Sequence, residues 1–435
     1  MELFGISFLF YFLPLFLGVY YITSDKNKPL TIFLGSVIFY LLQDGIALWQ
    51  VCLALAITAV TFLIGRVIEQ HRFALPWGLG LLVAVLVFFK CFRGGEYLPG
   101  GMSFYIFQMA AYLVDIRQGR VPPEKSFISY GAQMWMFPRL LSGPLAEPMQ
   151  LQAQMAGPKI TQLRFRAGLQ ELVAGLSMKV LLADRLAGAW SQAQVIGFES
   201  LSSVSAWVAL ICFALRLYFD FHGYSMIAVG LGKLMGFELP RNFDSPYAAR
   251  SVSDFYRRWH MTLTRWFRQY VYIPLGGNRK GKFCTVLNIL IVWMLTGLWH
   301  GVGGNYLLWG TFLGLVIAAE KLWFGKRLER MPIGSHFYTI GVVLLSWIPF
   351  AIGDPGQLLL FLVQLFSLRG IEIGAMAPYI PLMLAGIVFA SPLPERLFRS
   401  FRERIWFDCV LFVLFWVCIY FVSTTAQDPF VYFNF

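Results

Sequence analysis

The stretch V-L-N-I-L-I-V-W-M-L-T-G-L-W at Val286–Trp299 contains no charged residue and ends directly before His300. A helix of about 20 apolar residues can cross a bilayer, so a run of this kind predicts a segment within a membrane. Ionisable side chains are costly at membrane depth and are therefore candidates for function. The histidine that follows this stretch is the first such candidate.

Similar apolar segments recur along the chain, and no long polar stretch separates them. We therefore expect one integral-membrane domain over residues 1–435 and an all-α fold, because a helix satisfies its own backbone hydrogen bonds in lipid. Some segments are too short to cross alone, which predicts about 11 to 13 transmembrane or re-entrant helices. The segments are Leu3–Thr23, Leu30–Trp49, Val51–Val67, Leu75–Phe89, Met102–Ile116, Leu169–Leu182, Ser205–Leu231, Val286–Trp299, Tyr306–Leu322, Tyr338–Phe350, Leu358–Leu368, Tyr379–Ala390 and Ile405–Val422.

The composition agrees with a membrane protein. Hydrophobic residues make up 58% of the chain and charged residues 13%, whereas soluble domains have about 45–50% and about 25%. The formal net charge of +12 comes from basic residues in short loops, which indicates topology signals and contact with anionic lipid rather than nucleic acid. The six cysteines show no metal-ligand spacing, so we expect no metal site and no disulfide.

Basic loops give an orientation. Lys26 and Lys28 follow the first apolar segment, and four arginines between 396 and 404 precede the last one. The positive-inside rule places both loops in the cytoplasm, with the tail 423–435 outside, in a multi-pass inner (plasma) membrane protein. The first segment has no cleavage signal and is expected to remain as a helix. Leu397–Arg404 is expected to form a short amphipathic helix at the membrane surface.

The segment 237–282 breaks the apolar pattern with arginines, lysines and aromatic residues, and it is too polar to cross lipid. Ser251–Asp254 offers N-cap residues for a helix, and Leu275–Asn278 predicts a turn. The band Asp254–Tyr272 has two interpretations: a flat interfacial helix with snorkelling cations, which composition favours, or the wall of a cavity for an anionic substrate.

Among five histidines, His300 and His260 both follow a tryptophan. A neutral imidazole can act as a general base, but a buried histidine can also be purely structural. His71 and His336 are expected to be structural. The run Phe137–Pro144 interrupts an apolar region with two prolines and a glycine, which predicts a re-entrant segment beside a cavity or a simple turn.

Taken in order, several motifs resemble the membrane-bound O-acyltransferase superfamily, in particular its bacterial alginate O-acetyltransferase branch, to which the teichoic-acid D-alanyltransferases are related. They cover most of the chain and are highly specific as a set. The motifs are Gly101–Gln108, Phe137–Pro144, Gly175–Val180 with Ala183–Arg185, Tyr218–Ser225, Arg241–Tyr247, Asp254–His260 continuing to Gly277–Gly281, Leu298–Gly301 with Asn305, and Pro429–Phe435.

The resemblance implies a cone of helices around a tunnel, with His300 as the catalytic histidine and His260 as the second histidine of this branch. His300 would act as general base, and His260 and its neighbours would orient the donor or stabilise the oxyanion. This chain differs from the family pattern at His222 and Met226, because the family usually has serine and aspartate at these two positions. Further tunnel or substrate-binding candidates are Arg257, Arg258, Trp259, Trp299, Asn305, Ser142 and Pro144.

The aromatic tail Pro429–Phe435 is similar to endings that recur in this branch. One hypothesis is that Tyr432 accepts the acyl group and passes it to a secreted partner. The alternative is an aromatic plug at the membrane surface.

The resemblance thus implies an O-acyltransferase that moves an acyl group, most simply acetyl, across the membrane to a cell-envelope polysaccharide or peptidoglycan. No bound cofactor is expected, and the donor would be acetyl-CoA or another acyl thioester. A secreted esterase-like partner of the SGNH type would complete the transfer. The alternatives are D-alanyl transfer to teichoic acid and a transporter without covalent chemistry, since broken helices and buried histidines also suit transporters.

Overall fold

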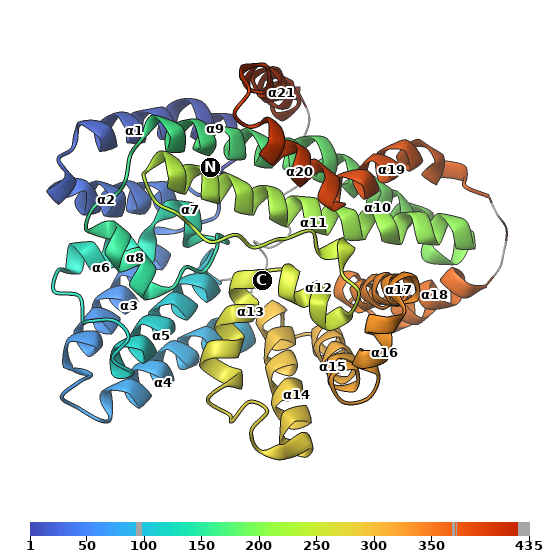
Figure 1. Ribbon diagram of the computed structural model, residues 1–435, viewed down its shortest axis with the longest axis horizontal. Coiled ribbons are helices and arrows are strands. Elements are labelled where there is room, and N and C mark those ends of the chain that lie inside the picture. The colour runs from blue at the N-terminus through green and yellow to red at the C-terminus, as the bar shows by residue number, and fades with distance from the viewer. Residues whose placement is uncertain (93–97, 368–369, 371, 425–435) are drawn as a thin grey trace.

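The computed structural model describes residues 1–92, 98–367, 370 and 372–424, and all regular structure within them is helical (Figure 1). In this part of the chain, seven helices are long and apolar enough to cross a bilayer, and a pair bent by 63° raises the number to as many as eight. The seven are α3 (Leu48–Val67), α4 (Ala74–Val87, continuing to Cys91), α11 (Ser203–Leu234), α14 (Gly281–His300), α15 (Gly304–Ala319, continuing through α16, Gly325–Arg330), α17 (Pro332–Ala351) and α21 (Ile405–Thr424).

Other apolar segments form shorter or inner helices. Helix α5 (Met102–Arg117) is buried along almost its whole length, and the expected segment Leu169–Leu182 lies in α9 (Gln162–Ser177) and the following π-helical turn (Met178–Ala183). The remaining α-helices are α1 (Leu13–Ile22), α2 (Lys28–Leu41), α6 (Phe127–Trp135), α7 (Phe137–Leu140), α8 (Pro148–Met155), α10 (Asp184–Ile196), α12 (Val252–Arg258), α13 (Met261–Phe267), α18 (Pro355–Phe366), α19 (Ile380–Phe389) and α20 (Pro392–Phe401).

Helix α11 runs through the middle of the molecule, with α9 and α20 on one side of it in Figure 1 and α12 to α17 on the other. Its contact with α9 depends on two opposed pairs of glycines. A Cβ on Gly223 would lie 2.6 Å from the carbonyl oxygen of Gly175, and a Cβ on Gly175 would lie 2.5 Å from that of Gly223. Gly168 and Gly230 face each other similarly, at 2.8 and 2.6 Å. Small residues allow this backbone approach, which is a common way of packing membrane helices.

The predicted break at Phe137–Pro144 is a buried irregular segment. Helix α6 ends at Trp135, α7 lasts a single turn, and the chain then continues without regular structure to Glu147. Its backbone is satisfied from other elements, because the Phe137 N–H donates to Ser36 Oγ at 3.0 Å and the Leu145 N–H to Thr262 Oγ1 at 3.1 Å. Irregular backbone of this kind is tolerated at membrane depth when protein surrounds it. The segment is thus part of the protein interior and not a surface turn.

The band Asp254–Tyr272 is not one flat interfacial helix. Helices α12 and α13 are interrupted at Trp259 and His260, and both of these residues are buried. The predicted N-cap is confirmed, since Ser251 Oγ accepts the Asp254 N–H at 2.9 Å. Arg257 and Arg265 of the same band are exposed. The alternative of a cavity wall for an anionic substrate therefore stays a prediction.

The amphipathic helix expected at Leu397–Arg404 is present, but its bounds were wrong. Helix α20 begins at Pro392 and ends at Phe401, so the last arginines of the expected range lie beyond it. Ser391 Oγ accepts the Leu393 N–H at 3.3 Å and Pro392 occupies the first turn, and both features favour a helix start there. The helix follows α19 across the sharp bend of 63°.

Candidate active site

His300 is the last residue of α14 and is only 4% exposed. Its ring lies edge-on to Trp309 and Phe350, with centroids 5.1 and 5.0 Å away. These rings come from α15 and α17. Helix α15 approaches α14 closely because Gly297 has no side chain: a Cβ there would lie 2.4 Å from the carbonyl oxygen of Tyr306. The glycine contact and the aromatic rings hold the imidazole in an enclosed, mostly apolar environment.

His260 lies between α12 and α13 with a left-handed backbone, φ 43° and ψ 53°. A non-glycine residue in this region is strained, and such strain is often found at functional sites. The His260 Nδ1 atom is 3.3 Å from Asn242 Oδ1, which also accepts the Thr262 hydroxyl at 2.6 Å. The ring of Phe221 lies edge-on at 4.6 Å. The orientation of the imidazole is thus fixed by one polar contact and one aromatic contact.

Trp299 joins the two histidines. Its ring centroid is 4.5 Å from that of His300 and 6.1 Å from that of His260, and Phe104 packs against it at 5.7 Å. The backbone carbonyl of Trp299 accepts a hydrogen bond from the ammonium group of Lys90, a buried cation that comes from the end of α4. We call His260, Trp299 and His300 the histidine–tryptophan cluster.

Two buried atoms of this cluster, His260 Nε2 and Trp299 Nε1, have no hydrogen-bond partner among the described residues. Buried polar atoms are nearly always hydrogen-bonded, so such a pair indicates a place for a reacting group. Because the Asn242 Oδ1 atom accepts hydrogen bonds, His260 Nδ1 carries the hydrogen and Nε2 offers a lone pair. The indole Nε1–H can only donate. The cluster therefore offers both an acceptor and a donor to a bound substrate.

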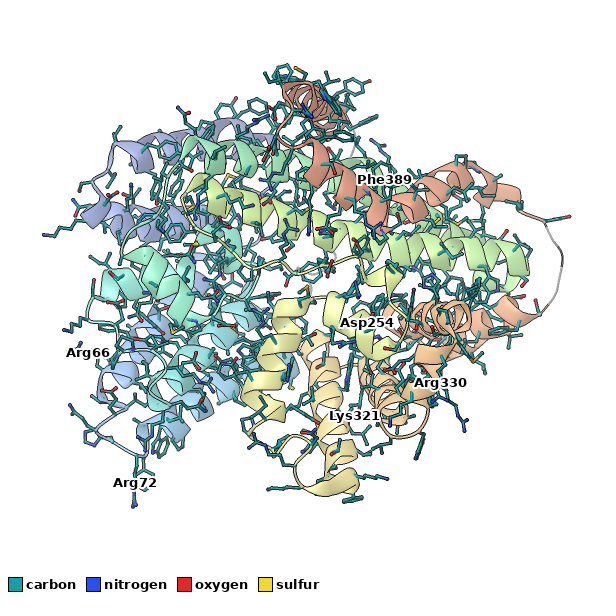
Figure 2. All side chains as sticks on the ribbon, in the orientation of Figure 1. Arg66, Arg72, Asp254, Lys321, Arg330 and Phe389 are labelled. Carbon is teal, nitrogen blue, oxygen red and sulfur yellow. The ribbon has the colours of Figure 1, made fainter. Side chains whose placement is uncertain are left out.

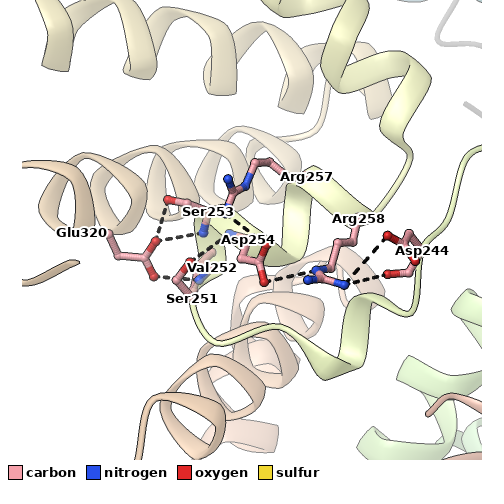
Figure 3. Close-up of polar contacts among 8 residues, drawn as sticks. All are labelled: Asp244, Ser251, Val252, Ser253, Asp254, Arg257, Arg258 and Glu320. Carbon is pink, nitrogen blue, oxygen red and sulfur yellow. Dashed lines mark hydrogen bonds and ion pairs between the residues drawn. The ribbon is translucent and has the colours of Figure 1, made fainter. Parts of the chain in front are cut away.

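Two of the predicted binding residues, Arg257 and Arg258, form ion pairs next to the cluster. As Figure 3 shows, both contact Asp254: Arg257 Nη2 at 3.0 Å and Arg258 Nε at 3.1 Å. Arg258 also lies 3.9 Å from a carboxylate oxygen of Asp244. These pairs stabilise the end of α12 and its connection to the loop before it.

Trp259 and Asn305 support the rings around the histidines. Trp259 packs against Phe255 at 5.4 Å and Trp347 at 5.2 Å. The Asn305 side-chain amide donates to the carbonyl of Pro349 at 2.9 Å, directly before the phenylalanine that contacts His300. The structure therefore gives both residues contacts that position the site.

Ser142 and Pro144 lie in the buried irregular segment, which is connected to the cluster through Thr262. The Pro144 carbonyl accepts a hydrogen bond from Arg139 Nε at 3.1 Å, and the next residue, Leu145, donates to Thr262 Oγ1. Ser142 Oγ has no partner within the described ranges. Thr262 in turn donates to Asn242, the asparagine that contacts His260, so hydrogen bonds join the segment to this histidine.

Two further sequence predictions concern the tail and metals. Tyr432 lies outside the described residues. Within the described residues, no group of three or more His, Cys, Asp or Glu side chains is arranged to hold a metal ion.

Glu320, directly after α15, contacts the start of α12, as the dashed lines at the left of Figure 3 show. It is 4% exposed, and its carboxylate accepts the backbone N–H groups of Val252 at 2.7 Å and Ser253 at 2.8 Å and the Ser253 hydroxyl at 2.6 Å. A carboxylate at a helix N-terminus is favoured by the exposed N–H groups and the helix dipole. This contact positions α12, and with it Trp259 and His260.

We expect Glu320→Ala to destabilise the protein by on the order of 2–4 kcal/mol, because two buried N–H groups would lose their acceptor. The measurement is thermal unfolding in detergent together with acyl transfer. Glu329→Ala is the matched control, since Glu329 is exposed on α16. Equal unfolding temperatures for the two variants would show that Glu320 does not anchor α12.

Sequence reasoning missed Asn242, Lys90 and Glu320. A signal was present for Lys90, because it is a single cation at the end of an apolar segment. Asn242 lies within the quoted motif Arg241–Tyr247 but had no assigned role. Nothing in the sequence near Glu320 indicates that its partners are the backbone N–H groups of residues 252 and 253.

Comparisons with known proteins identify the family of the chain. A family model described as MBOAT, membrane-bound O-acyltransferase family, matches residues 117–350. A probable alginate O-acetylase of Pseudomonas putida is 33% identical over 372 residues, covering 79% of this chain and 76% of the relative. A peptidoglycan O-acetyltransferase of Helicobacter pylori is 29% identical over 430 residues, covering 84% and 80%. A teichoic acid D-alanyltransferase of Streptococcus thermophilus is 25% identical over 285 residues, covering 58% and 68%. The chain belongs to the membrane-bound O-acyltransferase family and is a multi-pass membrane acyltransferase.

Proposed function

We propose that the protein lies in the inner membrane and transfers an acyl group, most simply acetyl, from a cytoplasmic acyl thioester such as acetyl-CoA. The group moves across the membrane towards hydroxyl groups of an extracytoplasmic polysaccharide or peptidoglycan. A secreted SGNH-type partner would complete the transfer. The observation that carries the proposal is the histidine–tryptophan cluster, in which two imidazoles flank one indole inside a membrane protein. The relatives named above as O-acetylating enzymes support acetyl as the group.

In the proposed reaction, His300 takes the proton of the acceptor hydroxyl as its oxygen attacks the thioester carbonyl. The indole N–H of Trp299 would donate to the oxyanion that forms on the former carbonyl oxygen. Collapse of this intermediate breaks the carbon–sulfur bond, and the thiolate that leaves takes the proton back from His300. His260 Nε2, which offers a lone pair, accepts a hydrogen bond from the donor or acceptor and so orients it.

The test is mass spectrometry of cell-envelope polymers from a deletion strain with and without the restored gene, combined with isotopically labelled acetyl-CoA supplied to purified protein. We expect loss of O-acetyl groups from one polymer and transfer of label by the protein. Loss of D-alanine esters instead would support the teichoic-acid alternative, for which the Streptococcus thermophilus relative is the supporting observation. Unchanged polymers would contradict the proposal.

The relay through Tyr432 has its own test. If the phenol carries the acyl group, Tyr432→Phe should reduce polymer acetylation by about a hundredfold or more, because the variant keeps the ring and loses only the nucleophilic oxygen. The double variant Tyr432→Phe with Phe433→Tyr moves the hydroxyl by one residue and so tests whether its position matters. Full acetylation by Tyr432→Phe would contradict the relay and favour the alternative in which the tail is an aromatic plug at the membrane surface.

A further inference from the structure

A cavity lies between α9, α11, α19, α20 and α21, and its lining does not include His260 or His300. The cavity has a volume of about 520 Å³, within the size range of small-molecule sites. Most of its wall is apolar and includes Leu181, Val229, Phe389 and Leu411. Figure 2 shows Phe389 at the end of α19, where the chain turns into α20.

The apolar wall continues onto the lipid-facing surface. Val388 and Leu393, which line the cavity, are 53% and 52% exposed. Large apolar side chains exposed beside a membrane helix are in contact with acyl chains. The cavity is therefore continuous with the part of the surface that faces lipid, which favours an apolar chain over a soluble molecule as its occupant.

The rim of the cavity is charged, with two arginines and two glutamates among its lining residues. Arg241 Nη1 and Arg399 Nη2 share one carboxylate oxygen of Glu395, at 2.7 and 2.5 Å. Arg241 also lies 3.8 Å from Glu171, which binds Lys233 at 2.6 Å. Arg399 is the more accessible of the two arginines, because its side chain is 59% exposed against 46% for Arg241.

Further basic residues extend this charge along the membrane surface. Helix α20 and the three residues that follow it carry Arg396, Arg399, Arg402 and Arg404 against only Glu395 and Glu403. An amphipathic helix with an apolar face and such a basic face lies in the membrane interface and attracts anionic lipid.

We propose that this cavity binds one acyl chain of an anionic phospholipid, whose phosphate contacts Arg399 on α20. The apolar wall takes the chain, and the excess of arginines over glutamates along α20 and the residues after it selects the negative head group. The phospholipid belongs to the leaflet in which α20 lies.

The cavity also reaches the active site through one residue. Asn242 lines the cavity, and its Oδ1 atom is the contact of His260 Nδ1. His222 lines the same wall, and its Nδ1 has no hydrogen-bond partner within the described part of the chain. A bound acyl chain would pack beside Asn242 and hold it against His260. This link to catalysis rests on the proposed function, whereas the binding itself does not.

The experiment is native mass spectrometry of the full-length protein after delipidation and incubation with vesicles of phosphatidylglycerol or of phosphatidylcholine. We expect one phosphatidylglycerol to stay bound per chain and to be preferred over phosphatidylcholine by about tenfold. Ala174→Phe, which adds a ring to the cavity wall, should reduce retention by about tenfold or more, and Arg399→Gln should remove the preference between the two lipids.

The matched controls are Ala56→Phe on the exposed side of α3 and Arg72→Gln in an exposed loop, both of which should bind lipid as the unaltered protein does. Thermal unfolding of Ala174→Phe, measured beside Ala56→Phe, separates loss of the lipid site from loss of the fold. Equal retention of both lipids by the unaltered protein, or unchanged retention by Ala174→Phe, would overturn the proposal. Displacement of the lipid by coenzyme A would also overturn it, because the cavity would then belong to the donor path. None of these readings requires acyl transfer, so they stand apart from the test of the proposed function.

Discussion

Replacing His300 with alanine is expected to reduce acyl transfer by about a hundredfold to ten-thousandfold, the usual range for loss of a general base. The imidazole is enclosed by Trp309 and Phe350, and no second base with the same surroundings stands at the end of α14. The measurement is transfer of labelled acetyl from acetyl-CoA to polymer, with the rate compared at saturating donor so that weaker binding is not mistaken for slower chemistry.

The matched control for this variant is His71→Ala, because His71 is exposed in a loop and is expected to be structural only. His300→Ala is expected to lower the unfolding temperature, because removal of a buried ring leaves a cavity. His300→Gln, which keeps most of the volume, should be as inactive as the alanine variant. Normal transfer by both His300 variants would remove the histidine from the proposed mechanism.

Replacing Gly223 with leucine is expected to destabilise the fold severely. The new Cβ would lie 2.6 Å from the backbone oxygen of Gly175, and backbone atoms cannot move aside as the end of a flexible side chain can. Overpacking of a well-packed interior costs about 1–3 kcal/mol and more when backbone must shift. Because α9 and α11 also meet at Gly168 and Gly230, the two helices would separate along their whole contact.

The measurement is the yield of monodisperse protein in detergent and its unfolding temperature. Gly80→Leu provides the control, because a side chain at Gly80 in α4 meets no atom within 4 Å. Both variants add the same side chain to a membrane helix, so the difference between them isolates the contact with α9. If Gly223→Leu unfolds at the same temperature as Gly80→Leu, the glycine pairs do not determine how α9 and α11 pack.

Much of the fold could be predicted from the sequence because lipid imposes one simple requirement on the backbone. The apolar stretch Val286–Trp299 lies within α14, and Ile405–Val422 lies within α21. Hydropathy could not separate lipid-crossing helices from inner ones such as α5, because a helix buried in protein is as apolar as one that faces lipid. The opposed glycines could not be paired from sequence either, since their contacts join residues 48 or more positions apart.

The candidate site was predictable in part. The two Trp-His pairs pointed to His260 and His300, and the structure brings both against Trp299. The resemblance to a known family, rather than composition, carried the assignment of chemistry to them. Asn242 and Lys90 could not be assigned in this way, because each reaches the cluster from a distant segment and makes its contact through a single atom.

The contact of Glu320 with α12 has a consequence for how the chain is assembled during synthesis. A chain made from its amino end produces residues 252 and 253 well before residue 320. Until α15 has been inserted, the first N–H groups of α12 lack the carboxylate that later binds them. While α14 and α15 are being synthesised, the first N–H groups of α12 therefore need water as their hydrogen-bond partner. The turn that carries Trp259 and His260 then stays at the water boundary until Glu320 is in place. The candidate active site is therefore completed late, by a carboxylate that binds the start of α12.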